Sequence, residues 1–377
     1  MSDTKDPLSP WQLPAFDPFE PVELSEQAAA VNAAHLRACS EARMIDYGMS
    51  RSDAACLRER VGRGAGWAET TTMLALRDRS IADGARGRHP VTAAAFFVHE
   101  AACWNFQQVV EVQDGPERTA TYQKMVDAFA EAQAIDWKLP AHVTVPTSVG
   151  NVAAWMIPPS AAGEPVVIQF GGLTGWGLAF NRSALALAER GIGSVLLELP
   201  GQGLTRMEHQ TYLDEQFAAS VISVVDWIQA NWVSKRVGIL GNSMGGLFAA
   251  RAAAAEPRLA ACCINGAPID PIPMFERYPR QWHLAAAMCP PAARGADSVK
   301  SFWRGLAFDQ RSALPGDLLV THGAADILVS REQHAAFLGS WERASMVEWP
   351  GAEHCVFNFA EERDALVCDW FAHQLRE

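Results

Sequence analysis

Apolar positions recur with a helical period in the first part of the chain. Runs such as 25–42, 93–110 and 118–134 are rich in Ala, Leu, Met, Glu and Gln, and their apolar residues fall three or four positions apart. That spacing is typical of amphipathic helices, and no convincing alternation of the β-strand type intervenes. The pattern therefore predicts an all-helical N-terminal domain over residues 1–140.

Five prolines distinguish the start of this domain. They lie among aromatic side chains, at Pro7, Pro10, Pro14, Pro18 and Pro21. Because proline breaks helices, we expect an extended arm that lies on the domain and takes no part in catalysis.

From residue 141 to residue 377 the pattern becomes strand, turn and helix, repeated. The expected strands cover 142–146, 152–157, 166–170, 193–197, 236–240, 259–264, 318–321 and 345–348. Helical patterns separate most of them, at about 182–191, 213–232, 331–341 and 361–374. Apolar strands that alternate with helices predict an α/β fold with a mostly parallel central sheet flanked by helices. A stretch at about 270–314, which contains several prolines, interrupts this rhythm and is expected to be an insertion or lid.

Composition places the chain among globular proteins. Of its 377 residues, 49% are apolar and 20% are charged, and no stretch has the roughly 18 uninterrupted apolar residues of a membrane span. The 43 acidic and 31 basic residues give a net charge of −12, which opposes binding to a phosphate backbone or an anionic membrane. We therefore expect a small-molecule substrate as the partner, with no nucleic acid and no membrane, and we leave a homodimer open.

Cysteine usage and the first residues favour the cytoplasm. The eight cysteines contain no C-x-x-C pair and are diluted in a long chain, as is typical of reduced thiols. The segment from Met1 to Pro7 has no apolar stretch of the signal-peptide type, so a cytoplasmic location is expected. The chain has no H-E-x-x-H motif and no carboxylate run with ligand spacing, so no metal and no other cofactor is expected.

The strongest chemical signal is the pentapeptide Gly241-Asn242-Ser243-Met244-Gly245, a G-x-S-x-G motif between a predicted strand and an alanine-rich predicted helix. Glycines on both sides allow the sharp strand-to-helix turn that lifts a serine hydroxyl above the strand ends. The turn also places the N–H of Met244 at a helix N-terminus, where developing negative charge is stabilised. This context favours Ser243 as a nucleophile over a chance match in an ordinary turn.

A serine nucleophile needs a histidine base and an acid that orients it. In the chain order Ser, Asp, His, the acid follows a late strand and the histidine lies in the loop after the last strand. Asp326 follows the predicted strand at 318–321, and His354 lies in a glycine-containing loop after the last predicted strand. Asp270, which also follows a strand, is the main rival acid, and the alternative for Asp326 is a turn or cap residue.

The loop Gly171-Gly172-Leu173-Thr174-Gly175-Trp176, directly after the strand at 166–170, is expected to supply a second donor to a substrate oxyanion. Its small residues let backbone amides approach a carbonyl oxygen, so the N–H of Leu173, or alternatively of Gly172, would act with that of Met244. A dinucleotide-binding loop is the competing interpretation, but the glycine spacing is not G-x-G-x-x-G.

These motifs resemble the α/β-hydrolase superfamily over the second part of the chain, with Ser243 as nucleophile, Asp326 as acid and His354 as base. The whole chain is similar to a narrower group, which comprises 2,6-dihydroxypseudooxynicotine hydrolase, the FrsA-like esterases and the fungal polyketide-shortening hydrolases. Members of that group carry a helical domain of this size before the hydrolase core. The match rests on the helical runs 93–102 and 122–129, on the turn at Ser243 and on the segments 170–173, 199–203 and 351–354.

The resemblance implies a serine hydrolase that cleaves a ketone C–C bond of a small, aromatic or polyketide-like substrate, in a retro-Claisen type of reaction. Hydrolysis of a carboxylic ester with the same triad is the alternative, and a non-catalytic ligand-binding protein is a further one. In the nicotine-pathway member a further carboxylate assists C–C cleavage, and the corresponding stretch here offers Asp270 and Glu276. The alternative for Glu276 is a solvated carboxylate of the lid that takes no part in the reaction.

Aromatic residues suggest where a substrate would bind, since the chain contains 13 tryptophans. We expect the pocket between the helical domain and the strand ends, because ligand sites of open parallel sheets lie at those ends. Trp176, Trp104 and Phe275 are the candidates to line it. Ordinary core packing is the alternative for each of the three.

Overall fold

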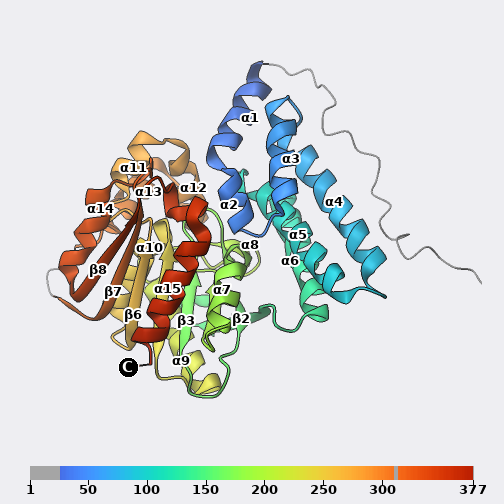
Figure 1. Cartoon of the computed structure of the whole chain (residues 1–377). Coiled ribbons are helices and arrows are strands. Elements are labelled where there is room, and N and C mark those ends of the chain that lie inside the picture. Colours follow the sequence, from blue (N-terminus) through green and yellow to red (C-terminus); the bar gives the residue numbers. More distant parts are fainter. Residues whose placement is uncertain (1–25, 310–312, 377) are drawn as a thin grey trace, which may run out of the picture. The chain divides into compact units, whose positions relative to one another are not determined.

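The computed structural model describes residues 26–309 and 313–376, and these divide into two units (Figure 1). The first unit extends to Leu139, except for Val112–Asp114, which belong to the second unit that begins at Pro140. The arm expected over the first residues lies outside the described part. Among the described helices, none combines the length and the apolar character that crossing a bilayer requires.

Helices alone build the first unit, within the residues described. They are α1 (Glu26–Ala38), α2 (Glu41–Asp46), α3 (Arg51–Gly62), α4 (Trp67–Ala85), α5 (Pro90–Val109) and α6 (Pro116–Ile135). Proline suits the first turn of α5 and α6, because its missing N–H would have no intrahelical partner there. α5 packs against α4 and α6, and these three helices bury the large apolar side chains Leu74, Phe97 and Phe129.

The run 25–42, which the apolar spacing predicts to be helical, is divided near Ser40. α1 ends at Ala38, and Ser40 caps α2, since its hydroxyl accepts a hydrogen bond from the backbone N–H of Arg43 at 3.1 Å. Serine favours this position because its side chain satisfies a backbone N–H that has no partner within the helix. The chain therefore forms two helices there instead of one.

An eight-stranded sheet forms the centre of the second unit (Figure 1). Its strands are β1 (Ala141–Thr147), β2 (Gly150–Ile157), β3 (Val166–Phe170), β4 (Gly193–Leu197), β5 (Val237–Asn242), β6 (Leu259–Asn265), β7 (Leu314–Gly323) and β8 (Trp341–Trp349). Their order is β1-β2-β4-β3-β5-β6-β7-β8, antiparallel where β2 meets β1 and β4 and parallel elsewhere. The mostly parallel sheet predicted from the sequence is confirmed.

Helices cover both faces of this sheet. They are α7 (Asn181–Ala188), α9 (Ala218–Trp232), α10 (Met244–Ala255) and α15 (Ala360–Gln374). α7 and α15 form one core with Val167 of β3, whereas α9 and α10 form another with Val166 and Ile168. Successive residues of a strand point to opposite faces, so a short continuous apolar run contributes to both cores.

The expected insertion at about 270–314 lies between β6 and β7, apart from Leu314, which begins β7, and its described part is largely helical. It contains α11 (Ile272–Arg277), α12 (Arg280–Met288), the 3₁₀ turn η3 (Pro291–Ala293) and α13 (Ala296–Gly305). Phe275 and Trp303 are fully buried, their ring centroids lie 5.2 Å apart, and both belong to the same core as α9 and α10. Burial of these aromatic rings anchors the insertion on the second unit.

Candidate active site

Ser243 lies in a sharp turn between β5 and α10. Its backbone has a φ of 55° and a ψ of −133°, a region that residues with a Cβ rarely adopt. A Cβ on Gly241 would lie 2.1 Å from the carbonyl oxygen of Gly245, and a Cβ on Gly245 would lie 2.6 Å from that of Gly171. Only glycine fits at both flanking positions, so the G-x-S-x-G pattern follows from the steric demands of the turn.

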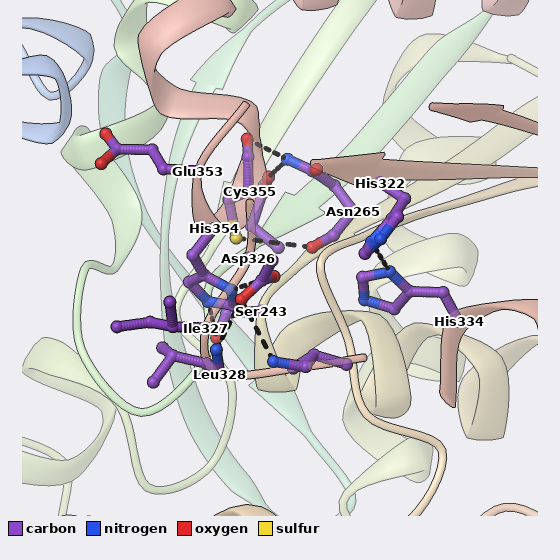
Figure 2. A network of polar contacts seen from close by, with 12 residues as sticks. Ser243, Asn265, His322, Asp326, Ile327, Leu328, His334, Glu353, His354 and Cys355 are labelled. Carbon is purple, nitrogen blue, oxygen red and sulfur yellow. Dashed lines mark hydrogen bonds and ion pairs between the residues drawn. The ribbon is translucent and has the colours of Figure 1, made fainter. Parts of the chain in front are cut away.

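Three side chains from separate loops form one hydrogen-bonded chain (Figure 2). The Oγ of Ser243 lies 2.9 Å from Nε2 of His354, and Nδ1 of His354 lies 2.7 Å from Oδ2 of Asp326. Asp326 follows β7, and His354 follows β8 at the start of the 3₁₀ segment η5 (His354–Phe359). The structure thus brings together the three residues that the sequence suggests as nucleophile, base and acid.

The surroundings of Asp326 favour its charged form. Its Oδ1 accepts backbone hydrogen bonds from Leu328 at 2.8 Å and from Val329 at 3.1 Å. Burial alone would raise the pKa of Asp326, but His354 and these two N–H groups outweigh burial and lower it below its ordinary value. Asp326 is therefore a carboxylate at neutral pH.

The imidazole of His354 is oriented by that carboxylate. Burial lowers the pKa of His354, whereas the Cys355 and Asp326 side chains raise it, and the result lies well above the ordinary value of 6.5. An ionised Asp326 keeps the proton of a neutral His354 on Nδ1, which leaves Nε2 as an acceptor for the Ser243 hydroxyl. The arrangement can therefore transfer a proton from the hydroxyl to the ring.

The loop after β3 lies against the start of α10. A Cβ on Gly172 would lie 2.8 Å from the backbone nitrogen of Met244 and 3.1 Å from Cβ of Ser243. Met244 is the first residue of α10, and among the described residues neither its N–H nor that of Leu173 has a backbone acceptor. Two N–H groups are thus available close to the Ser243 turn, the feature that an oxyanion site requires.

Asn265, at the end of β6, connects the loops that carry these groups (Figure 2). Its Nδ2 donates to Oδ1 of Asn242 at 2.7 Å and to the carbonyl oxygen of Cys355 at 3.1 Å. Its Oδ1 accepts from the Thr321 hydroxyl at 2.9 Å, and its carbonyl oxygen accepts from the N–H of Ser243 at 2.7 Å. The sequence patterns do not predict this connecting role for Asn265. A polar residue at the end of a buried apolar strand is the signal that could have indicated it.

We expect Asn265→Ala to lower the free energy of unfolding by about 2–4 kcal/mol, because it leaves buried polar groups on neighbouring elements without a partner. Chemical denaturation followed by circular dichroism measures this loss. Asn231→Ala is the matched control, since Asn231 is exposed on α9 and donates to one carbonyl oxygen of its own helix. The control should stay within about 0.5 kcal/mol of wild type. An equally small loss for Asn265→Ala would contradict its connecting role.

Two strained residues follow His354 directly. Cys355 and Val356 have left-handed backbone conformations, with φ values of 54° and 59°. Such conformations are unfavourable for residues with a Cβ, and most of all for a β-branched valine. The carbonyl oxygen of Cys355 accepts hydrogen bonds from Asn265 and from Nη1 of Arg363, both at 3.1 Å. These bonds hold the strained loop and so support the position of His354.

A pair of histidines, His322 and His334, lies near the hydrogen-bonded chain (Figure 2). Nδ1 of His322, on β7, is 2.5 Å from Nδ1 of His334, on α14 (Arg331–Ala335), so one ring donates and the other accepts. Burial lowers the pKa of His334 to about 3, and that ring is therefore neutral at neutral pH. The pair joins α14 to the end of β7, the strand that leads to Asp326.

The aromatic candidates for a pocket wall are all buried. Trp176 is 1% exposed and donates its indole N–H to the carbonyl oxygen of Gly172 at 3.0 Å. Phe275 lies in the core that the insertion shares with α9 and α10, and Trp104 lies in the first unit, where it donates to Glu100 at 3.1 Å. These contacts give all three a packing role, and contact with a substrate stays a prediction.

The two carboxylates of the insertion that the sequence suggests as catalytic groups, Asp270 and Glu276, have different surroundings. Asp270 lies before α11, where its Oδ1 accepts the backbone N–H of Ile272 at 3.0 Å, so this rival acid serves as a turn residue. Glu276 is exposed on α11. Within the described residues the acid that bonds His354 is Asp326.

One group in the first unit has atoms that could hold a metal ion. Asp53, Asp78 and His99 each place one ligand atom within 4.8 Å of the others. Arg77, however, already contacts both carboxylates, with Nη2 2.6 Å from Oδ1 of Asp78. Burial and the neighbouring Asp53 raise the pKa of Asp78 to about 7. A guanidinium in this place opposes a second cation, so the group is best described as a buried ion-pair cluster.

Comparison with known proteins gives the family. The model of the alpha/beta hydrolase family matches residues 171–370, which is more than half of the chain. This chain belongs to the alpha/beta hydrolase family. The matched residues include all three members of the hydrogen-bonded chain and the loop after β3.

This alpha/beta hydrolase is 26% identical over 229 residues to 2,6-dihydropseudooxynicotine hydrolase of Paenarthrobacter nicotinovorans, a match that covers 58% of this chain and 60% of that protein. A crystal structure of 2,6-dihydroxy-pseudo-oxynicotine hydrolase is similar with a TM-score of 0.78, at 20% identity, over 89% of this chain and 96% of that one. The wild-type AbyA5 structure follows with a TM-score of 0.63, at 17% identity, over 92% and 99%. At identities of 20% and 17%, these two solved structures support the alpha/beta-hydrolase fold of this chain and nothing beyond the fold.

Proposed function

We propose that this alpha/beta hydrolase is a serine hydrolase in which Ser243 attacks a substrate carbonyl. The observation that carries the proposal is the hydrogen-bonded chain from Ser243 through His354 to Asp326. A serine hydroxyl is a weak nucleophile at neutral pH, and it needs such a base to take up its proton. Membership of the family supports the same reaction class.

Each group has a defined part in the proposed reaction. Nε2 of His354 takes the hydroxyl proton while Oγ of Ser243 bonds to the carbonyl carbon, and the N–H groups of Leu173 and Met244 stabilise the oxyanion. The bond to the leaving carbon then breaks, its electron pair stays with that carbon, and His354 returns the proton to it. Water attacks the acyl-enzyme next, with His354 as base, and the acid product leaves as Oγ recovers its proton.

The substrate class that we infer is a small ketone whose leaving carbon delocalises negative charge, such as a 1,3-diketone or an electron-rich aryl ketone. A carbanion is a poorer leaving group than an alkoxide, so C–C cleavage demands this delocalisation. Similarity to 2,6-dihydropseudooxynicotine hydrolase supports an aromatic ketone. The same protein groups would hydrolyse an ester if the substrate offered an oxygen leaving group.

Product analysis by mass spectrometry on a matched panel of aryl esters and 1,3-diketones tests this reaction. In water labelled with ¹⁸O, each diketone should yield a ketone and a carboxylic acid that carries one labelled oxygen from hydrolysis of the acyl-enzyme. Turnover of the esters alone would assign the chain to ester hydrolysis. A folded protein that turns over neither class would favour ligand binding without catalysis.

We expect kcat/KM to fall as the pH drops through the pKa of His354, because only the neutral ring accepts the Ser243 proton. Since that pKa lies above the ordinary value of 6.5, the fall should begin on the alkaline side of this value. A pH–rate profile measured where the protein stays folded tests the expectation. A flat profile between about pH 5 and 8 would contradict His354 as the base.

A further inference from the structure

The two carbonyl groups at the start of the loop after β3 are held by buried side chains. Nε2 of Gln202 donates to the carbonyl oxygens of Gly171 at 2.7 Å and Gly172 at 3.0 Å. The indole N–H of Trp176 also donates to the Gly172 oxygen, at 3.0 Å. Gln202 is fully buried and Trp176 is 1% exposed, so these contacts are shielded from water.

The hydrogen bond that the side-chain oxygen of Gln202 accepts determines the orientation of its amide group. Oε1 accepts the N–H of Leu199 at 3.0 Å, while the backbone N–H of Gln202 donates back to the Leu199 carbonyl at 2.8 Å. An amide whose oxygen is engaged in this way presents its NH₂ group to the loop after β3. The residues that form this local pair lie between β4 and α8 (Gly203–Met207).

The direction of the Gly172 carbonyl decides the direction of the next N–H. No described peptide bond is cis, and in a trans peptide the C=O of one residue and the N–H of the next point in opposite directions. Because the Gly172 oxygen points to Gln202 and Trp176, the N–H of Leu173 points to the other side of the peptide. Gly172 lies against the backbone nitrogen of Met244, the other expected oxyanion donor.

We propose that Gln202 is a positioning residue: by holding the Gly172 carbonyl, it aims the N–H of Leu173 at the substrate oxyanion. Trp176 supports the same orientation through the hydrogen bond from its indole N–H to the Gly172 carbonyl oxygen. The inference rests on the proposed function, in which Leu173 and Met244 donate to that oxyanion. A loop of two glycines needs such support, since glycine adopts many backbone conformations at little cost.

Trp176 is itself fixed by a cation. The guanidinium of Arg206 lies 5.1 Å from the centroid of the indole ring, and its Nη1 donates to the carbonyl oxygen of Gly201 at 2.9 Å. Arg206 is almost fully buried, so its contact with the ring is stronger than it would be in water. The donor to the Gly172 carbonyl is thereby held in one place.

Gln202→Met and Gln202→Glu test the role, because both remove the donor while only glutamate keeps an acceptor for Leu199. Both variants should lower kcat by about 10²- to 10³-fold, the loss typical of one oxyanion donor, with little change in KM. An aryl trifluoromethyl ketone forms a tetrahedral adduct with an oxyanion in the same place, and its affinity should fall by a similar factor. The acid limb of the pH profile should not move, because His354 keeps its partners.

Two further variants separate positioning from a general loss of structure. Trp176→Phe keeps a ring but loses one donor, and because Gln202 still holds the Gly172 carbonyl, kcat should fall by about tenfold or less. Gln333→Ala is the matched control, since Oε1 of Gln333 binds the backbone N–H groups of Ile269 and Asp270 in another loop. This control should leave kcat and inhibitor affinity unchanged.

The outcomes distinguish this inference from the proposed function. Wild-type kcat and inhibitor affinity in both Gln202 variants would overturn the positioning role and leave the proposed function intact. A wild-type protein that turns over neither esters nor diketones would overturn the proposed function. A crystal structure of Gln202→Met then decides the inference: a rotated Gly172–Leu173 peptide supports it, and an unchanged peptide overturns it. If the glutamate variant does not fold, the methionine variant carries the same test.

Discussion

Replacing Ser243 with alanine is expected to lower kcat by about 10⁴- to 10⁶-fold, a loss of about 5–8 kcal/mol in transition-state stabilisation. The substitution removes the atom that forms the acyl-enzyme, whereas the N–H groups of Leu173 and Met244 still bind a substrate oxygen. A small residual rate above the uncatalysed reaction is therefore expected. Steady-state kinetics on the best substrate of the panel measures the loss, and thermal unfolding checks that the variant is folded.

A serine elsewhere in the same unit provides the control. Ser223 lies on α9, and its hydroxyl donates to the carbonyl oxygen of Ala219 at 3.0 Å. Ser223→Ala removes the same atom type without touching the hydrogen-bonded chain, so kcat should remain at the wild-type value. Substantial turnover by Ser243→Ala, comparable with that of Ser223→Ala, would refute Ser243 as the nucleophile.

Asp326→Asn is expected to lower kcat by about 10⁴-fold while the chain keeps its fold. Asparagine has nearly the same shape and can still accept the N–H groups of Leu328 and Val329. It lacks the negative charge that keeps the His354 proton on Nδ1, so Nε2 no longer reliably accepts the Ser243 proton. The lost charge also lowers the pKa of His354, and the acid limb of the residual activity should move to lower pH.

Asp317→Asn tests whether the loss of a nearby carboxylate is enough to have this effect. Asp317 lies on β7, the strand that leads to Asp326, and pairs with the exposed Arg343, with N···O distances of 2.8 and 2.9 Å. Surface ion pairs contribute about 0–1 kcal/mol, so both kcat and the pH profile should stay unchanged. An Asp326→Asn variant with a near wild-type rate and an unmoved acid limb would show that another group orients His354.

Local signals in the sequence explain why the turn at Ser243 could be predicted. The strand, the flanking glycines and the helix are neighbours in the chain, so the pentapeptide 241–245 dictates its own geometry. The roles of Asp326 and His354 could be predicted from their order along the chain, because the loops that follow parallel strands lie at the same edge of a sheet. The mostly parallel sheet follows from short apolar runs that alternate with helical patterns.

Contacts between distant segments could not be predicted in this way. Asn265 and Gln202 are amides with partners that are distant in the sequence, and only the packed sheet brings those segments together. Ser40 divides a helical run through one capping hydroxyl, which the apolar spacing does not report. Trp176 and Phe275 illustrate a further limit, since a large aromatic side chain fits a pocket wall and a core equally well until its neighbours are known.

Peptide mapping by mass spectrometry after treatment with a fluorophosphonate tests most directly whether Ser243 is an activated nucleophile. In that reaction Oγ bonds to the phosphorus atom and fluoride leaves. We predict one adduct on the peptide that contains Ser243, absent in Ser243→Ala and formed much more slowly in Asp326→Asn. A folded wild-type protein that remains unlabelled, or that carries its adduct on another residue, would contradict the central claim.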